Sequence, residues 1–192
     1  MKKQFIMASL VAASTSMMAM DLQYFLGAGA NRVDANLNEK GSLSTGAVLN
    51  DSYDFKDTAL LLKTGIILDK THRISLSHTK FSKDGTDARN IIGSYDYLIP
   101  LKEEFRLYAG LHAGNTKVEV DSDSASASGL AYGAQIGAIY DITKNIEFEL
   151  GLAYSKYNVD YSTSGTISGV SYQYKVELED STSMFAGLNY KF

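Results

Sequence analysis

The chain has 192 residues, a formal charge of −4, one proline and no cysteine. This length suits a single domain, and the lack of cysteine excludes disulfides and thiolate chemistry. The mild acidity argues against a nucleic-acid partner, because such a partner selects for a basic patch.

The N-terminal segment predicts a secretory signal peptide. Lys2 and Lys3 provide a positive start, residues 5–13 are mostly apolar, and small or polar residues follow up to Ala19. The apolar stretch is much shorter than the roughly 20 residues that a membrane-spanning helix needs. We therefore expect residues 1–19 to be removed on export, which leaves 20–192 as one domain.

Beyond residue 20, apolar and polar residues alternate with a period of two, which indicates strands with two different faces. The end of the chain is the clearest case, with Met184, Leu188 and Phe192 in one phase and Gly187 and Lys191 in the other. About eight such strands are predicted, enough for the smallest usual membrane barrel. They cover residues 22–32, 58–68, 73–81, 89–99, 105–114, 130–141, 146–155 and 170–192.

The connections between these strands alternate in length. Short turns are predicted at 69–72, 100–104 and 141–145, and longer loops at 33–57, 82–88, 121–128 and 157–169. Short turns on one side and long loops on the other are typical of outer-membrane barrels, in which the turns face the periplasm. The longest segment, 33–57, has no clear period and is predicted to be a loop.

Two kinds of barrel fit this alternation. A soluble periplasmic barrel would turn its apolar face inward around a ligand, whereas a membrane barrel turns it outward. Here one face carries nearly all the charge and most of the glycine, which fits the crowded interior of an eight-stranded barrel. Aromatic residues of the apolar phase gather near the turn-side ends of the strands, as in a membrane girdle: Tyr24, Tyr97, Phe105, Tyr140, Phe148, Tyr190 and Phe192. We therefore predict an all-β, closed, antiparallel up-and-down transmembrane β-barrel.

The signal peptide, the alternating strands and the ending from Phe185 to Phe192 resemble a known family. They are similar to the small outer-membrane β-barrels of the OmpA-transmembrane-domain and opacity-protein type, a porin-like family. The resemblance implies a bacterial outer-membrane location and makes the terminal Phe192 a signal for the barrel-assembly machinery. It does not imply one activity, because members serve as adhesins, serum-resistance factors, structural proteins or narrow pores.

Charged residues of the inward phase gather near the periplasmic half of the predicted barrel. We expect Asp96 to pair with Arg106 across the turn at 100–104, and Lys191 to face Glu147 or Glu149. Such a cluster is either a charged constriction that selects ions or a paired network that fills the barrel. The second interpretation is favoured because an eight-stranded lumen is normally plugged. The predicted network comprises Lys63, Arg73, Asp96, Arg106, Glu147, Glu149 and Lys191.

The histidines do not predict an enzyme. His112 is expected to be buried in the lumen with no nucleophile beside it, and neither a metal site nor a cofactor site is predicted. Near His78, Lys80 falls on the lipid-facing phase, so either it lies at the outer rim or a bulge turns Phe81 outward. Lys80, Lys83 and Arg89 are candidates for contact with lipopolysaccharide phosphates, or are simply solvated.

The leading functional prediction is a structural or interaction protein that acts as a monomer. Its outward segments would contact lipopolysaccharide, an external surface or a protein ligand. The segment Val170–Leu178, with Tyr172 and Tyr174 exposed, is the predicted binding strip. A narrow pore for ions or small solutes is the alternative.

Overall fold

A computed structural model of the chain describes residues 21–83, 86–120, 125–167 and 169–192. The predicted signal peptide, residues 1–19, lies outside the described residues. The described part contains eight strands: β1 (Leu22–Leu43), β2 (Val48–Leu68), β3 (His72–Lys83), β4 (Thr86–Lys102), β5 (Phe105–Val120), β6 (Ala125–Asp141), β7 (Ile146–Ile167) and β8 (Val170–Lys191).

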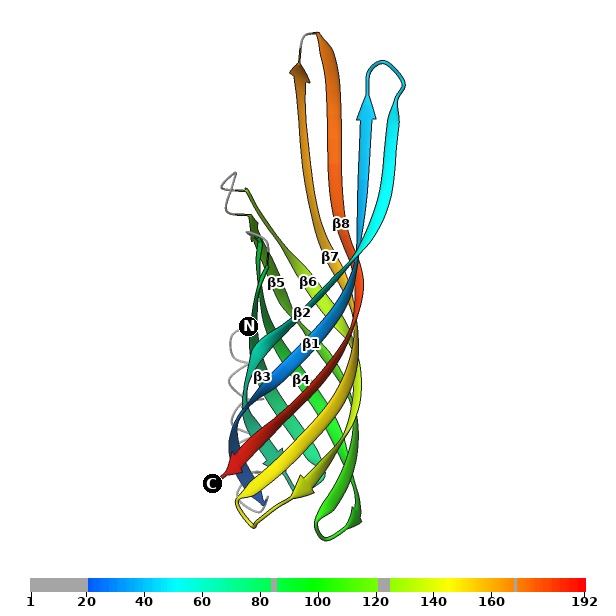
Figure 1. The fold of residues 1–192 in the computed structure, drawn as a ribbon. Coiled ribbons are helices and arrows are strands. Elements are labelled where there is room, and N and C mark those ends of the chain that lie inside the picture. The colour runs from blue at the N-terminus through cyan, green and yellow to red at the C-terminus, as the bar shows by residue number, and fades with distance from the viewer. Residues whose placement is uncertain (1–20, 84–85, 121–124, 168) are drawn as a thin grey trace, which may run out of the picture.

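The strands form a closed barrel. Each pairs antiparallel with the next, and β1 pairs with β8 to complete the ring. The first and last strand residues, Leu22 and Lys191, lie at the same end as the three short turns (Figure 1). The predicted all-β, up-and-down barrel is therefore confirmed. None of the described residues forms a helix long and apolar enough to cross a membrane.

Two of the predicted loops are wrong, because they are hairpins. Residues 33–57 complete β1 and begin β2 around a turn at 44–47, and 157–167 continue β7. Because β1 also pairs with β8 as far as Leu43 opposite Tyr172, the order β7-β8-β1-β2 makes one sheet. It rises well beyond the other four strands (Figure 1). We call its upper part, residues 37–43, 48–57, 159–167 and 170–178, the projecting sheet. The predicted loops at 82–88 and 121–128 are also shorter, since β3 reaches Lys83 and β6 begins at Ala125.

The outer wall of the lower barrel is apolar. Leu60, Leu111 and Ile136 are 63%, 67% and 58% exposed, whereas Arg73 and Glu147 in the lumen are fully buried. Apolar side chains around the outside and ions inside are the arrangement expected in lipid and the reverse of a soluble barrel. The soluble ligand-binding alternative is therefore wrong.

This polarity inverts above the lipid belt. On β1, Leu26 and Ala30 face outward below, but Arg32 and Asp34 face outward above them while Val33 is buried. Water replaces lipid on the outside at this height, so the polar face belongs there. Most apolar residues of β1 have even numbers below this level, such as Ala30, and odd numbers above it, such as Val33. The pairing of β1 with β2 continues through this change without a bulge. This shift removes the single period from 33–57, which is the reason that a loop was predicted.

Strand β8 inverts its polarity in a different way. Its apolar residues keep one phase throughout, but the pairing with β1 shifts where Asn36 faces Asp180 and Leu37 faces Leu178. The extra residue, Glu179, is a β-bulge that turns every side chain above it to the other face. Met184 therefore faces lipid, while Leu178 packs inside against Val33 and its neighbours.

The register of β3 resolves the choice left open at Lys80. No register shift interrupts its pairing with β4, and Phe81 is buried at 3% exposure. Lys80 points outward and binds Asp87 at 2.6 Å. Lys80 is therefore a rim residue, and the bulge that would have turned Phe81 outward does not exist.

Candidate functional site

The residues predicted for the aromatic girdle all lie near the turn-side end of the barrel. Six of them are between 40% and 68% exposed on the outer wall, and Phe105 is half-buried. Tyr95 adds a further ring to the girdle. His72, which was predicted in a turn, is the first residue of β3. The centroid of its ring lies 6.0 Å from that of Tyr95 and 5.6 Å from that of Tyr97. Phe192 contacts the Tyr190 ring and donates its backbone N–H to the Tyr24 carbonyl at 3.0 Å. Its role as an assembly signal stays a prediction.

The lower lumen is filled by an ion-pair network that we call the charged plug. Arg73 lies at its centre, fully buried, with Nη2 2.8 Å from Glu149 and Nε donating to Asp96 at 2.9 Å. Lys63 binds the same Glu149 oxygen at 2.9 Å. The Arg73 guanidinium also stacks over the Tyr108 ring at 4.5 Å. Three strands that are not all neighbours, β2, β3 and β7, are thereby linked through the lumen.

A second part of the charged plug lies nearer the turns. Arg106 binds Glu147 at 2.7 Å and Asp141 at 2.8 Å, and Lys191 binds Asp141 at 2.6 Å. The predicted Asp96–Arg106 pair is wrong, because Asp96 directly faces Arg73 across β3 and β4. Lys191 does approach Glu147, at 3.6 Å.

The sequence interpretation missed three polar members of the charged plug. Asp141 was predicted where the strand 130–141 meets the turn 141–145 and was not included in the network, although it is the last residue of β6 and half-buried beside Arg106. Asn189 donates to Glu147 and Glu149, both at 3.0 Å, and Gln135 donates to Asp96 at 2.6 Å. All three stand in the inward phase of their strands, and that phase was the signal that could have found them.

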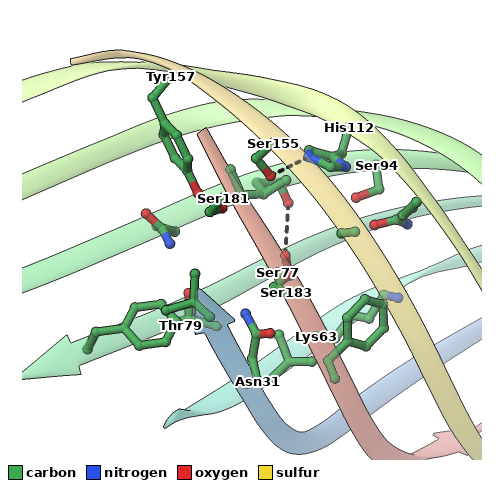
Figure 2. A pocket seen from close by; sticks show the side chains of 18 residues that line it. Asn31, Lys63, Ser77, Thr79, Ser94, His112, Ser155, Tyr157, Ser181 and Ser183 are labelled. Atoms are coloured by element: carbon green, nitrogen blue, oxygen red, sulfur yellow. Dashed lines mark hydrogen bonds between the residues drawn. The ribbon is translucent and has the colours of Figure 1, made fainter. Parts of the chain in front are cut away.

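Above the charged plug lies a small polar cavity of about 70 Å³, which we call the upper chamber. Hydroxyl groups from several strands converge on it, among them Ser77, Thr79, Ser155 and Ser181 (Figure 2). His112 Nε2 lies 2.9 Å from Ser155 Oγ. This pair could not be predicted from the sequence, because its two strands are separated by β6. No hydrogen-bond partner for His112 Nδ1 is present among the described residues, so no acid completes a triad there.

Next to the upper chamber lies a second cavity, the apolar mouth, of about 90 Å³. Its wall includes Phe55 and Phe81 from β2 and β3, Val118 from β5 and Leu178 from β8. Phe81 also forms a buried cluster with Val33, Ala35 and Ala59. The polar lumen therefore becomes apolar at the same level at which the outer wall becomes polar.

The tips of the projecting sheet carry exposed apolar side chains. Leu43, Val48 and Leu49 are 44%, 77% and 53% exposed, and we call these three residues the tip patch. Backbone and side-chain hydrogen bonds between Ser44 and Ser171 tie the two hairpin tips together at 2.9 and 3.2 Å.

The predicted binding strip lies on the inner face rather than outside. Tyr172 and Tyr174 are half-buried and line the cavity beside the tip patch, and the Tyr172 ring lies directly over Gly165. Their expected full exposure is wrong, because the bulge at Glu179 turns this stretch of β8 inward.

The outer face of the projecting sheet is polar and extensively paired. Glu177 accepts hydrogen bonds from Lys175 at 2.6 Å and Lys40 at 2.8 Å. These contacts lower the pKa of Glu177 to about 2 and raise the pKa of Lys175. Asp180 accepts a hydrogen bond from Tyr154 at 3.0 Å and another from Asn36 at 2.5 Å. This face is built for water and holds the two long hairpins to each other.

Comparison with solved structures finds the same architecture in known proteins. Neisserial surface protein A has a TM-score of 0.61 at 18% identity, over 88% of this chain and 97% of that chain. Outer membrane protein OprG from Pseudomonas aeruginosa has a TM-score of 0.66 at 18% identity, over 88% and 95%. Outer membrane protein H from P. aeruginosa has a TM-score of 0.56 at 21% identity, over 88% and 99%. No protein-family model matches the sequence, and no curated protein sequence is significantly similar to it.

The chain has the fold of the small outer-membrane β-barrel proteins. Together with the apolar outer wall, this fold places the barrel in the bacterial outer membrane. In such barrels the short turns face the periplasm, so the projecting sheet of this outer-membrane barrel stands on the extracellular side.

The cations at the rim of the outer-membrane barrel have acidic neighbours. Arg89 lies 3.4 Å from Glu119, and Lys80 binds Asp87. The side chain of Lys83, the third candidate for a phosphate contact, lies outside the described residues. Among the described residues, no group of three or more histidine and acidic side chains is arranged to hold a metal ion.

Proposed function

We propose that the barrel is a surface-binding protein that contacts an external surface or protein ligand through the tip patch. The observation that carries this proposal is the exposure of Leu43, Val48 and Leu49 at the far end of the projecting sheet. Leu43 and Leu49 lie on its inner face with Tyr172 and Tyr174, and Val48 lies on its otherwise polar outer face. Apolar side chains grouped in water, away from the lipid belt, are typical of an interaction site. The tied tips hold the patch in place, which reduces the entropy lost on binding.

The narrow pore gains no support from the geometry. The ions of the lower lumen are buried and paired, and the rings of Tyr108 and Phe25 pack against Arg73. We expect planar-bilayer recordings of the wild type to show no open-channel current. A steady conductance that changes on Glu149→Gln would favour the pore instead.

Lipopolysaccharide is a second proposed contact. Lys80 and Arg89 point outward at the level where the outer wall becomes polar, which is the height of the phosphate groups of the outer leaflet. Their acidic neighbours Asp87 and Glu119 weaken their positive potential. We therefore propose a modest contribution to membrane anchoring from these cations and assign the surface-binding role to the tip patch. The barrel-assembly machinery is the proposed partner during insertion.

Substitution of the tip patch tests the proposal. We would replace Leu43, Val48 and Leu49 together by serine in cells that express the protein, and count cells bound to epithelial monolayers and to polystyrene. Burying one such side chain contributes about 1.5–3 kcal/mol, so the triple variant should lose at least about 100-fold in affinity.

The matched control replaces Asn38, Asn50 and Ser52 on the outer face of the same hairpin by alanine. This control should bind like the wild type, and both variants should keep the gel shift on boiling that marks a folded barrel. Equal binding by the serine variant and the wild type would show that the tip patch is not the binding surface.

A further inference from the structure

The upper chamber and the apolar mouth are adjoining cavities above the charged plug. Both are lined by Val33, Phe81, Asn90 and Tyr157, so the two cavities meet at these four side chains. The site is polar at its floor and apolar at its extracellular opening. Such a gradient fits a molecule with a polar head and an apolar tail.

Polar side chains around this site hold atoms that lack partners. His112 Nδ1 and the Oδ1 atoms of Asn31 and Asn90, from residues of the upper chamber, have no hydrogen-bond partner among the described residues. The same is true of Oγ1 of Thr116, a residue of the apolar mouth. His112 and Thr116 are 6% and 2% exposed. Buried polar atoms in native proteins are almost always hydrogen-bonded, so these atoms indicate that a polar group belongs between them.

The charge balance of the plug decides the kind of head. Its cations Lys63, Arg73, Arg106 and Lys191 are matched in number by the carboxylates of Asp96, Asp141, Glu147 and Glu149, and these ions bind one another. No surplus charge is left to neutralise a charged head, and burying an unpaired ion is costly. The volume of about 70 Å³ also limits the head to a small group such as a hydroxyl or a carboxamide.

The tail has a matching wall. Leu37, Phe55 and Leu178 line the apolar mouth together with Val118. Above them, Val176 continues the inner face of the projecting sheet. An extended alkyl chain that leaves the upper chamber would lie against these residues, with its far end toward the extracellular side. Burial of each methylene contributes about 0.8 kcal/mol.

We propose that the upper chamber and the apolar mouth bind an uncharged single-chain amphiphile, such as a long-chain primary alcohol or fatty amide, with its head toward the charged plug. The site is separate from the tip patch, so the proposal stands or fails independently of the surface-binding role.

The test uses the full barrel in lipid nanodiscs, because detergents are themselves amphiphiles. Two photoreactive decan-1-ol probes carry a diazirine, one near the hydroxyl and one near the chain end. Mass spectrometry should map the head-end probe to residues that line the upper chamber alone, such as Ser155 or Ser181, and the tail-end probe to Phe55 or Leu178. Unlabelled decan-1-ol should compete about tenfold better than decane, because one to two hydrogen bonds to the hydroxyl contribute about that much affinity. It should compete better than decanoate by a similar factor of about ten, because the charged carboxylate finds no partner in the site.

A double variant tests the role of the unpartnered polar atoms. Thr116→Val with Asn90→Leu removes two of the unpartnered atoms at nearly constant volume, so decan-1-ol should lose its advantage over decane while decane still competes. The matched control, Asn115→Leu with Thr182→Val, makes the same exchanges on the outer wall and should keep the preference. Labelling confined to the outer wall, or equal competition by decane and decan-1-ol in the wild type, would overturn the proposal and leave a water-filled chamber.

Discussion

Replacing Arg73 by methionine should destabilise the barrel strongly. Arg73 is 0% exposed, binds Asp96 and Glu149 at 2.8–2.9 Å and stacks over Tyr108. Breaking a buried ion pair by removing one partner costs about 3–5 kcal/mol. Glu149 keeps Lys63 and Asn189, whereas Asp96 keeps only the amide of Gln135, so the cost should arise mainly at Asp96.

This asymmetry predicts a specific rescue. Asp96→Asn removes the stranded charge and can still accept the hydrogen bond from Gln135, so Arg73→Met with Asp96→Asn should recover a large part of the loss. The coupling between the two changes should lie in the range of about 0.5–3 kcal/mol that contacting residues show. A coupling near zero would mean that the two side chains do not act on each other.

Urea titration of the barrel in lipid vesicles measures these effects, with the gel shift on boiling as the readout of folded protein. With a slope of about 2 kcal/mol per molar urea, the single variant should unfold at about 1.5–2.5 M less urea than the wild type. Lys40→Met, which breaks an exposed pair, is the control and should leave the midpoint unchanged. A wild-type midpoint for Arg73→Met would refute the view that the charged plug holds the barrel together.

Three further predictions follow from particular contacts. Gly29→Val should prevent barrel closure, because a Cβ at Gly29 would meet the Ala186 carbonyl and lie 2.6 Å from Gly187 Cα, whereas Gly93→Ala, with 3.6 Å to its nearest atom, should fold and shift on gels like the wild type. Phe81→Ala should lower the free energy of unfolding by about 3–5 kcal/mol in the same urea assay. A change of roughly 0.5 kcal/mol or less, which is typical of surface substitutions, would show that its cluster is not a core. The folded pKa of Glu177 lies at about 2, below its unfolded value of about 4.3. The stability that its pairs with Lys40 and Lys175 contribute should therefore be fully present above the unfolded pKa and be lost as the pH falls toward 2. Carboxyl NMR should show the lowered pKa of Glu177 in the wild type and a higher pKa in Lys175→Met.

The strand content of the lower barrel could be predicted from the sequence because one physical rule governs it. Lipid outside and a crowded polar lumen inside enforce a period of two, which places Arg73, Arg106 and Glu149 on the inner face without any knowledge of their partners. The partners could not be predicted in the same way. Lys63 meets Glu149 across the lumen, from strands that are not neighbours, and sequence phase carries no information on such contacts.

The upper barrel was predicted less well because its environment reverses. Two different features produce the reversal. The change of phase in β1 removes the continuous period, whereas the bulge at Glu179 in β8 keeps the period but reverses the face on which its apolar residues lie. The His112–Ser155 pair shows a related limit, since it depends on Gly133 leaving space between the two strands: a Cβ there would lie 2.8 Å from His112 Nε2.

The bulge at Glu179 also bears on how such barrels change over evolutionary time. Deleting this single residue would join Leu178 directly to Asp180, and Leu178 could still pair with Leu37 on the inner face. Tyr172, Tyr174 and Leu178 would keep facing inward, and β8 would then carry a change of apolar phase like that of β1. One codon gained or lost can therefore exchange a bulge for a change of phase while the wall of the barrel still turns its polar face to water at the same level.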